Sequence, residues 1–477
     1  MASSAHPTNR SPMSRIAIIG AGPIGLEAAL LATQLGHDVQ VFEKGRVAEN
    51  ILDWGHVRLF SPFEMNSSEW GRGALTKVLG PDALPHEDVL TGSEFAERYL
   101  IPLSRLPELA DRINENCHVL SISRQHFRKT EGIGSKTRGA EPFRLLIEQN
   151  STRRSVVDDS LDDASDDDER SSPPNSVRQV QARHEVFKYR VDERVQLADV
   201  VLDCSGTYPH HNWLGDGGLP CIGERDSLTE NHYRLPVIRE TEFGGRIVLV
   251  IGSGFSAATS VVALAELAKQ HPRTKVLWLA NSQPEKGIAA GPLTFIPNDP
   301  LIERDRLTAK ANDLAVVGHI SRASLTETSS HPVVWFSDVA VVSITRTKTF
   351  REFDGFEVEL DWSRSHQLRT DGQNPFPPSV TVDRIVANVG YRPDRSIYEE
   401  LHVHECYGTQ GPIKLAAKLL GETSSDCLSQ TTHGAEVLKN PEPNFFVLGS
   451  KSYGRNSNFL LRVGIEQVRE VLASLNH

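Results

Sequence analysis

The chain has 477 residues with 51 basic and 62 acidic side chains, giving a net charge of −11 at pH 7. Eight of the acids lie in residues 158–169, so the rest of the chain carries only −3, which argues against a nucleic-acid-binding surface. The length exceeds what one hydrophobic core supports and predicts at least two domains, while no apolar run is long enough to span a membrane. The five cysteines are odd in number and form no C-x-x-C pair, which suits a reducing cytoplasm and argues against a disulfide framework.

The first pattern in chain order is a strand, glycine turn, helix and strand. An apolar strand is expected at 16–19, and the run G-A-G-P-I-G follows at 20–25. Apolar residues then recur at helical spacing over 24–35, and a second apolar strand at 39–42 ends in an acid. This is the full sequence context of a dinucleotide-binding unit.

Each special residue of this unit has a physical role. Gly20 permits a tight turn, Gly22 lets the backbone approach a pyrophosphate, and Gly25 allows the helix to pack closely on the strand. The free N–H groups at the helix N-terminus favour the phosphates. Glu43 is placed to accept hydrogen bonds from a ribose, and the adjacent Lys44 is a further expected cofactor contact.

The segment after this unit is rich in loops. Residues 50–62 are aromatic and contain Gly and Pro, so they are expected to line a site rather than to form a long helix. Asn66 follows in the run Met-Asn-Ser-Ser-Glu, where it either serves chemistry or caps the turn before Trp70. An amphipathic helix is expected near 93–100, with Ser93 as its cap.

Strands are expected at 118–122 and 143–147, before the composition changes sharply. Residues 149–183 are dominated by Ser, Asp and Arg and predict a disordered acidic insertion, because they hold too few apolar side chains to offset ordering entropy. A further apolar strand at 198–203 runs into the small-residue turn at Gly206.

A second nucleotide-binding unit begins at residue 246. Its strand at 246–251 leads into G-S-G-F-S-A, whose key positions are Gly252, Gly254 and Ala257. A helix over 258–269 and a strand over 275–280 follow. This strand ends in Asn281 and Ser282, which carry no acid to repel a 2′-phosphate, so a mild preference for NADPH over NADH is expected.

The remaining chain repeats the pattern of the first half. Strands are expected at 333–336, 339–344, 356–360 and 382–389. A late apolar strand at 444–449 ends at Gly449 and Ser450, and a helix with one apolar face is expected over 459–475. The histidines at 210–211 and 402–404 have no Cys or His partners at ligand spacing, so no metal site is expected.

These motifs resemble the two-dinucleotide-binding-domain flavoproteins, which include the pyridine nucleotide-disulfide oxidoreductases and the flavin-containing monooxygenases. The resemblance implies an α/β fold of two Rossmann-like domains, with the NAD(P)H domain inserted into the FAD domain and antiparallel β-meanders attached. It assigns the FAD domain to 15–225 and 375–477 and the NAD(P)H domain to 226–374. Residues 1–14 are small and polar and are expected to be a disordered lead. FAD is expected on the first glycine turn, with Gly206, Gly449 and Ser450 on the flavin side, and NADPH or NADH on the second.

The resemblance leaves the reaction open between three alternatives. The first is a cytoplasmic monooxygenase acting on a small nitrogen or sulfur nucleophile through a flavin–oxygen adduct, since Asn66 lies in a run similar to the Asn-Ser motif of those enzymes. The second is a reductase with an unknown acceptor, without a redox-active disulfide because no two cysteines lie close in sequence. The third is a non-catalytic nucleotide sensor with a blocked cofactor channel. The F-x-G-x-x-x-H fingerprint of the flavin-containing monooxygenases is absent from 219–245.

Overall fold

The computed structural model describes residues 13–85, 89–153, 181–182, 185–186, 188–280, 291–320, 331–349, 353–364, 378–421, 428 and 432–475. Most of the expected lead and acidic insertion, together with Asn281 and Ser282, lies outside the described residues. Within the described part, no helix combines the length and the apolar character needed to cross a bilayer.

A parallel five-stranded sheet forms the first unit. Its strand order is β17-β9-β1-β2-β3. The strands are β1 (Arg15–Ile19), β2 (Asp38–Phe42), β3 (Ile113–Asn114), β9 (Val200–Asp203) and β17 (Phe445–Val447). All four residues of β9 and four of the five in β1 are buried, as the continuous apolar runs predict for a sheet covered on both faces.

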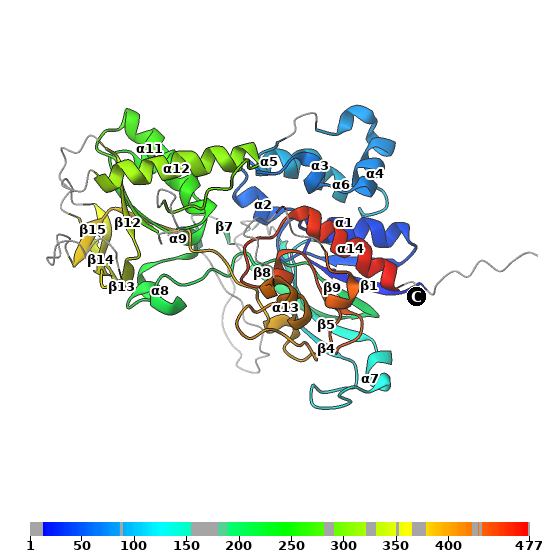
Figure 1. Cartoon of the computed structure of the whole chain (residues 1–477). Coiled ribbons are helices and arrows are strands. Elements are labelled where there is room, and N and C mark those ends of the chain that lie inside the picture. The colour runs from blue at the N-terminus through cyan, green and yellow to red at the C-terminus, as the bar shows by residue number, and fades with distance from the viewer. Residues whose placement is uncertain are drawn as a thin grey trace, which may run out of the picture.

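Helices cover this sheet, and two from opposite ends of the chain lie side by side in Figure 1: α1 (Pro23–Gln34) and α14 (Leu461–Leu475). The predicted apolar face of α14 is confirmed, since Ile465, Val468 and Leu472 are all buried. Shorter helices of this unit are α2 (Glu49–Asp53), α3 (Phe63–Asn66), α4 (Glu69–Leu79), α5 (Gly92–Phe95), α6 (Ile101–Ser104), α7 (Lys136–Ala140) and α13 (Ile413–Gly421).

The second unit is built on a parallel four-stranded sheet with the order β12-β11-β10-β16. Its strands are β10 (Ile247–Ile251), β11 (Lys275–Ala280), β12 (Val333–Ser337) and β16 (Arg384–Ala387). The helices α11 (Phe255–Gln270) and α12 (Ile302–Ile320) pack together beside it (Figure 1). Three short helices, α8 (Glu224–Ser227), α9 (Glu230–Tyr233) and α10 (Glu240–Phe243), precede it.

Antiparallel sheets flank both units, as the expected meanders require. In the first unit the order is β4 (Cys117–Arg124), β5 (Phe143–Arg153) and β8 (Lys188–Ala198). In the second it is β13 (Ala340–Lys348), β14 (Asp354–Asp361) and β15 (Ser379–Val382). A two-stranded ribbon joins β6 (Gln181–Ala182) to β7 (Glu185–Val186). The α/β fold class predicted from the sequence is confirmed.

The chain crosses between the units in two places. Leu214 and Cys221 already pack into the core of the second unit, together with Leu249 and Ile385. The strands β15 and β16 follow residue 375 in the chain and still pair within the sheets of the second unit. The second unit therefore starts earlier and ends later than the boundaries at 226 and 374 that the sequence suggests.

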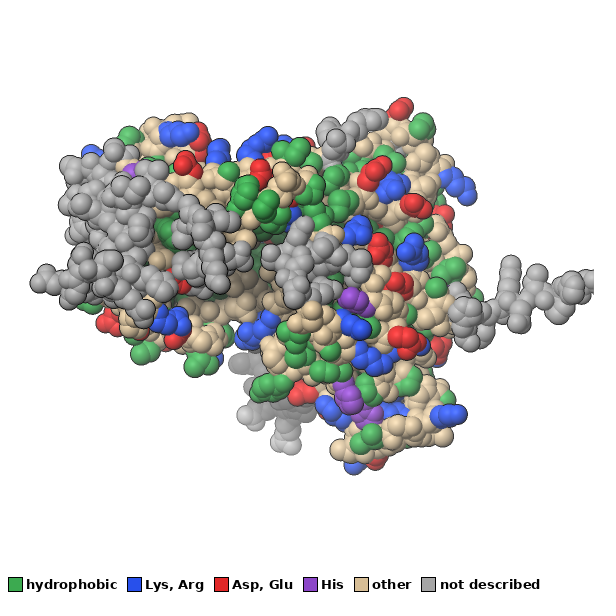
Figure 2. Space-filling model, in the orientation of Figure 1, with side chains coloured by type: hydrophobic (Ala, Val, Ile, Leu, Met, Phe, Trp, Pro, Cys, Tyr) green, Lys and Arg blue, Asp and Glu red, His purple; other side chains and the backbone are tan. Residues whose placement is uncertain are grey.

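Two local expectations differ from the structure. Thr91, not Ser93, caps the helix that begins with α5, because its hydroxyl accepts from the Glu94 backbone N–H while the Glu94 carboxylate accepts from the Thr91 N–H. The strand β5 runs to Arg153, beyond the position where the insertion was expected to begin. On the face shown in Figure 2, basic and acidic side chains are interspersed and form no large patch of one sign.

Candidate cofactor and active site

A cavity of about 1520 Å³ is lined by residues of both units, and both glycine turns are among them. In the first sheet the strand order reverses between β1 and β9, and in the second between β10 and β16. Open parallel sheets bind ligands outside the carboxyl ends of their strands at such reversal points. The fold therefore brings two dinucleotide-type sites to one shared space.

The first glycine turn has the shape that its sequence predicts. Gly20 has φ +96°, which an L side chain rarely adopts, and a Cβ there would approach the Cys204 carbonyl oxygen to 2.9 Å. A Cβ on Gly25 would come within 1.9 Å of the Gly20 carbonyl oxygen. Gly25 thus permits the close packing of α1 under the turn, and it does not line the cavity.

The second glycine turn is built in the same way. Gly252 has φ +140°, and a Cβ there would lie 2.2 Å from the Asn388 carbonyl oxygen and 3.3 Å from the Cβ of Ala257. Ala257 is fully buried beneath the turn, so it packs rather than lining the cavity. Asn388 lines the cavity and is held by the Ser260 hydroxyl, which donates to its Oδ1 at 2.8 Å.

The middle glycines face open space. Both Gly22 and Gly254 line the cavity, and a Cβ added to either would meet nothing within 4 Å. Each precedes a helix that has neither a side-chain cap nor an acidic residue in its first turn. The first N–H groups of α1 and α11 are therefore left for an anion, and the open backbone leaves room for it. These features fit a dinucleotide pyrophosphate at each turn.

Glu43 lines the cavity, whereas Lys44 does not. The Glu43 carboxylate accepts from the backbone N–H groups of Ala21 at 2.7 Å and Gly45 at 2.9 Å, which fixes it beside the first glycine turn. Burial raises the pKa of this carboxyl, and the two backbone bonds oppose the rise. The Lys44 side chain is exposed and points to no part of the cavity lining.

The flavin-side turns predicted from the sequence come together on the cavity wall. Gly206 (φ +71°) and Gly449 (φ +70°) both have left-handed backbones. A Cβ on Gly206 would lie 3.6 Å from the Ser450 hydroxyl, and one on Gly449 would lie 3.2 Å from Ile24 of the first turn. The structure therefore unites these turns with Gly20, Gly22 and Glu43 at one end of the cavity.

A buried ion pair not predicted from the sequence lies beneath these turns. The Lys451 ammonium is 2.6 Å from Asp203, and the two side chains are 1% and 0% exposed. Lys451 also donates to the Ser205 hydroxyl at 3.0 Å, while the other Asp203 oxygen accepts from the Ser205 N–H and hydroxyl. The only sequence signal for this pair is a carboxylate at the end of a buried strand.

Asn66 neither lines the cavity nor caps the turn before Trp70, the two roles that its motif suggests. Its side chain is buried, donates to the Ser61 carbonyl oxygen at 3.0 Å and accepts from the Ser61 hydroxyl at 2.7 Å. It is not among the residues that line the cavity, although the neighbouring Phe60 is. Ser68, not Asn66, caps α4 by accepting from the Gly71 N–H.

The described cysteines and histidines form neither a disulfide nor a metal site. Cys117, Cys204, Cys221 and Cys406 are free thiols, and burial raises the pKa of Cys204 and takes that of Cys221 to about 12. Cys427 lies outside the described residues. Among the described residues, no group of three His, Cys, Asp or Glu side chains is arranged to hold a metal ion.

The segment between β17 and α14 contributes to the cavity lining. Arg455 and Asn458 line the cavity, whereas Tyr453 is buried and packs edge-on against Phe459 at 5.3 Å. Arg304 also lines the cavity, paired with Asp299 at 2.6 Å. Sequence reasoning missed Arg304, because it lies on α12, well past the second glycine unit.

Comparison with known proteins finds a family match over the first glycine unit. Residues 17–133, which carry the first glycine turn, match the pyridine nucleotide-disulphide oxidoreductase family. This match and the fold agree with the resemblance to the FAD- and pyridine nucleotide-dependent flavoprotein oxidoreductases that the sequence predicts. No curated protein sequence matches the chain significantly.

Several solved structures share the fold along nearly the whole chain. The bacillithiol disulfide reductase of Bacillus cereus is 16% identical over 98% of this chain and 99% of that chain, with a TM-score of 0.57. The cadaverine monooxygenase of Erwinia amylovora, solved with FAD, is 12% identical over 97% and 94%, with a TM-score of 0.53. The reduced ornithine hydroxylase of Pseudomonas aeruginosa is 14% identical over 98% and 99%, with a TM-score of 0.52. Reductases and monooxygenases both have this fold, so the fold alone does not select the reaction.

Proposed function

We propose that this protein is a cytoplasmic NADPH-dependent flavoprotein monooxygenase that inserts oxygen into a small nitrogen or sulfur nucleophile. FAD would lie on the first glycine turn and Glu43, and NADPH on the second turn. The net reaction consumes one NADPH, one proton and one O₂, and yields the oxygenated substrate, NADP⁺ and water. The cofactors supply the redox chemistry, and the chain binds and orients them.

The observation that carries this proposal is the shared cavity. The open glycines of the two units, Gly22 and Gly254, line the same space, so two dinucleotides bound there can meet at their reactive rings. A non-catalytic sensor would need this space to be blocked, whereas the described lining is continuous from one turn to the other. Hydride transfer between the two cofactors is therefore the favoured common step.

The choice of acceptor rests on the cysteines. A dithiol reductase needs two thiols close together to take the electrons, and the sequence has no C-x-x-C pair. The four described cysteines are free, and Cys204, the one that lines the cavity, is a single buried thiol. Electrons must therefore leave to an acceptor from outside the chain, and O₂ with an organic nucleophile is the acceptor we propose.

The test separates oxygenation from simple reduction. The holoprotein is reduced with NADPH without oxygen, and the oxidised-flavin absorbance is then followed as O₂ is admitted, with peroxide measured in parallel. A monooxygenase returns to the oxidised spectrum only after a delay and releases little peroxide. Immediate reoxidation with one peroxide per NADPH would instead indicate a reductase that lacks its acceptor. No reduction by either NADPH or NADH would refute the proposal altogether.

A further inference from the structure

Four aromatic side chains line the cavity where the chain crosses between the two units. They are Trp54 from the end of α2, Tyr208 from the first crossing, Tyr233 from α9, and Tyr391 from the second crossing, and we refer to them as the aromatic wall. None of them belongs to the glycine turns at 20–25 and 252–257 or to the other residues expected to hold FAD or NADPH.

Each ring of the aromatic wall is held in place. The rings of Tyr208 and Tyr391 have centroids 4.5 Å apart, and the Tyr391 hydroxyl donates to the Tyr233 carbonyl oxygen at 2.8 Å. The Tyr233 hydroxyl in turn donates to the buried Glu224 at 2.7 Å. The Trp54 ring packs directly on Gly92, because a Cβ added to Gly92 would lie 2.8 Å from a ring carbon of Trp54. The wall is therefore preorganised, which lowers the entropic cost of binding against it.

The aromatic wall carries no charge. Burial raises the pKa of Tyr208, Tyr233 and Tyr391, so their hydroxyls remain protonated at neutral pH. The neighbouring charges have partners: Glu224 accepts from the Tyr233 hydroxyl, and the Asp53 carboxylate lies 3.1 Å from the Arg234 guanidinium.

The carboxylates of the described cavity lining are already engaged. Glu43 accepts from two backbone N–H groups, Glu49 lies 3.5 Å from Arg46, and Asp216 lies 2.9 Å from Arg364. A flexible alkylamine, which is cationic at neutral pH, would leave strong hydration without gaining a carboxylate from this part of the chain. A neutral molecule with a ring would lose little hydration and gain the flat aromatic contacts.

We propose that the aromatic wall is the substrate subsite and that it takes an uncharged aryl compound bearing a soft nucleophilic atom, such as an aryl sulfide. This inference rests on the proposed monooxygenase function. For a sulfide the sulfur lone pair forms the new S–O bond, one oxygen atom of O₂ enters the sulfoxide, and the other leaves as water with two electrons from NADPH and a proton. Cadaverine and ornithine appear in the names of two proteins of the same fold. Both are flexible cationic amines, the class of compound that this wall is not expected to bind.

The experiment uses the holoprotein with methyl phenyl sulfide, cadaverine and ornithine. Binding of each compound is measured by saturation-transfer NMR without NADPH, and turnover by coupled NADPH loss and product formation. We expect binding and sulfoxide formation with the aryl sulfide and neither with the two amines. If NADPH reduces the flavin and only an amine is oxygenated, the proposed subsite is wrong but the proposed monooxygenase function is supported. Failure of flavin reduction would refute the proposed function itself.

Variants of the wall locate the subsite. Tyr208→Leu removes a ring, and the matched control Tyr208→Phe removes only its hydroxyl. We expect Tyr208→Leu to raise the KM for the sulfide about tenfold, the change that about 1.4 kcal/mol produces, while Tyr208→Phe keeps it close to the wild-type value. Trp54→Leu, on a separate element, should act in the same direction if Tyr208→Leu folds poorly. A KM for NADPH that rises in place of the KM for the sulfide would assign the wall to nicotinamide and overturn the inference.

Discussion

Replacing Lys451 with methionine should weaken both the fold and the retention of FAD. The substitution keeps the length of the side chain but removes the ammonium 2.6 Å from Asp203, leaving a fully buried carboxylate with only the donors of Ser205. Removing one partner of such a buried pair costs about 3–5 kcal/mol. At a guanidinium slope of about 4 kcal/mol/M, the midpoint of unfolding should fall by about 1 M.

The same substitution should release the turn at the flavin side. Lys451 fixes the Ser205 hydroxyl at 3.0 Å, and Ser205, Gly206 and Ser450 all line the cavity. Flavin content after purification, read from the absorbance ratio of flavin to protein, should therefore decrease. Adding Asp203→Asn to Lys451→Met removes the uncompensated charge, so the double variant should be more stable than the sum of the single changes predicts, by up to about 3 kcal/mol.

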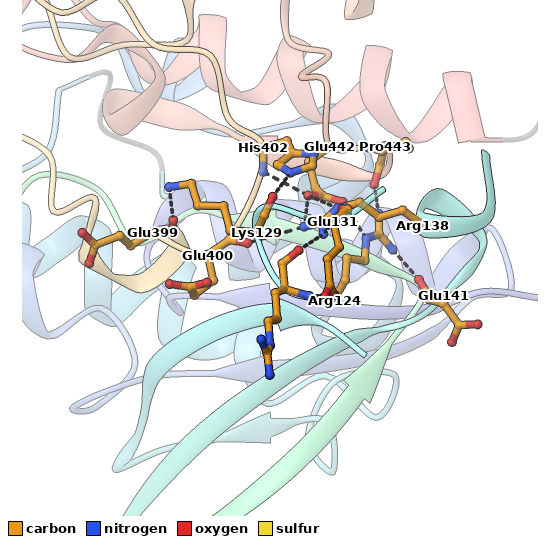
Figure 3. A network of polar contacts seen from close by, with 11 residues as sticks. Arg124, Lys129, Glu131, Arg138, Glu141, Glu399, Glu400, His402, Glu442 and Pro443 are labelled. Atoms are coloured by element: carbon orange, nitrogen blue, oxygen red, sulfur yellow. Dashed lines mark hydrogen bonds and ion pairs between the residues drawn. The ribbon is translucent and has the colours of Figure 1, made fainter. Parts of the chain in front are cut away.

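A second buried ion network provides the matched control (Figure 3). Glu442 is fully buried and accepts from Arg124 at 2.7 Å and Arg138 at 2.9 Å, yet none of the three lines the cavity. Glu442→Gln should lower stability by a similar amount and leave the flavin content of the folded protein unchanged. Equal loss of flavin in both variants, or full stability of Lys451→Met, would refute the reasoning that links this ion pair to the cofactor site.

Further predictions address the glycine turns, pH and the nucleotide. Gly22→Val should fold but lose FAD, because the valine side chain enters the space expected for the pyrophosphate. Gly254→Val should keep FAD, but NADPH should reduce its flavin slowly. Full flavin content in Gly22→Val would show that the first glycine turn is not the FAD site. Burial raises the pKa of Glu442, but the bonds from two arginines and a backbone N–H outweigh it and hold the pKa below its usual value. Its contribution to stability is therefore present above the unfolded pKa and lost as pH falls through the folded one, so the penalty of Glu442→Gln in denaturant unfolding should stay constant from about pH 7 to about pH 5 and shrink as the pH falls below about 4. Ser282→Asp should shift flavin reduction towards NADH by repelling a 2′-phosphate, and unchanged rates with both nucleotides would exclude Ser282 from the ribose contact.

Local sequence patterns predicted the central parallel strands and the glycine turns that follow them. The apolar runs at 16–19 and 247–251 are buried parallel strands, and the glycines after them adopt the turns that their spacing predicts. These features are encoded within a few residues, so periodicity and turn chemistry suffice to find them. The helix α12 was missed because it has no strong apolar stripe, and its packing against α11 and β12 stabilises it instead.

The parts of the site that depend on distant residues could not be predicted. Lys451 and Asp203 are 248 positions apart, and only the pairing of β17 beside β9 brings them together. The aromatic wall likewise brings together rings from widely separated parts of the chain. Asn66 shows that a short motif does not determine where a side chain lies, since its buried bonds are with Ser61 and it is not among the residues that line the cavity.

The position of β17 beside β9 also has a consequence for biosynthesis. The ribosome delivers all strands of the second parallel sheet, from residue 247 to 387, before residues 445–447 emerge. The second unit can therefore complete its sheet while β9 still presents an open edge in the first unit. The turn at Gly449 and Ser450 arrives with that last strand. A nascent chain stopped before residue 445 would have a complete second sheet and an unfinished first one, so loading of a flavin would follow the completion of synthesis.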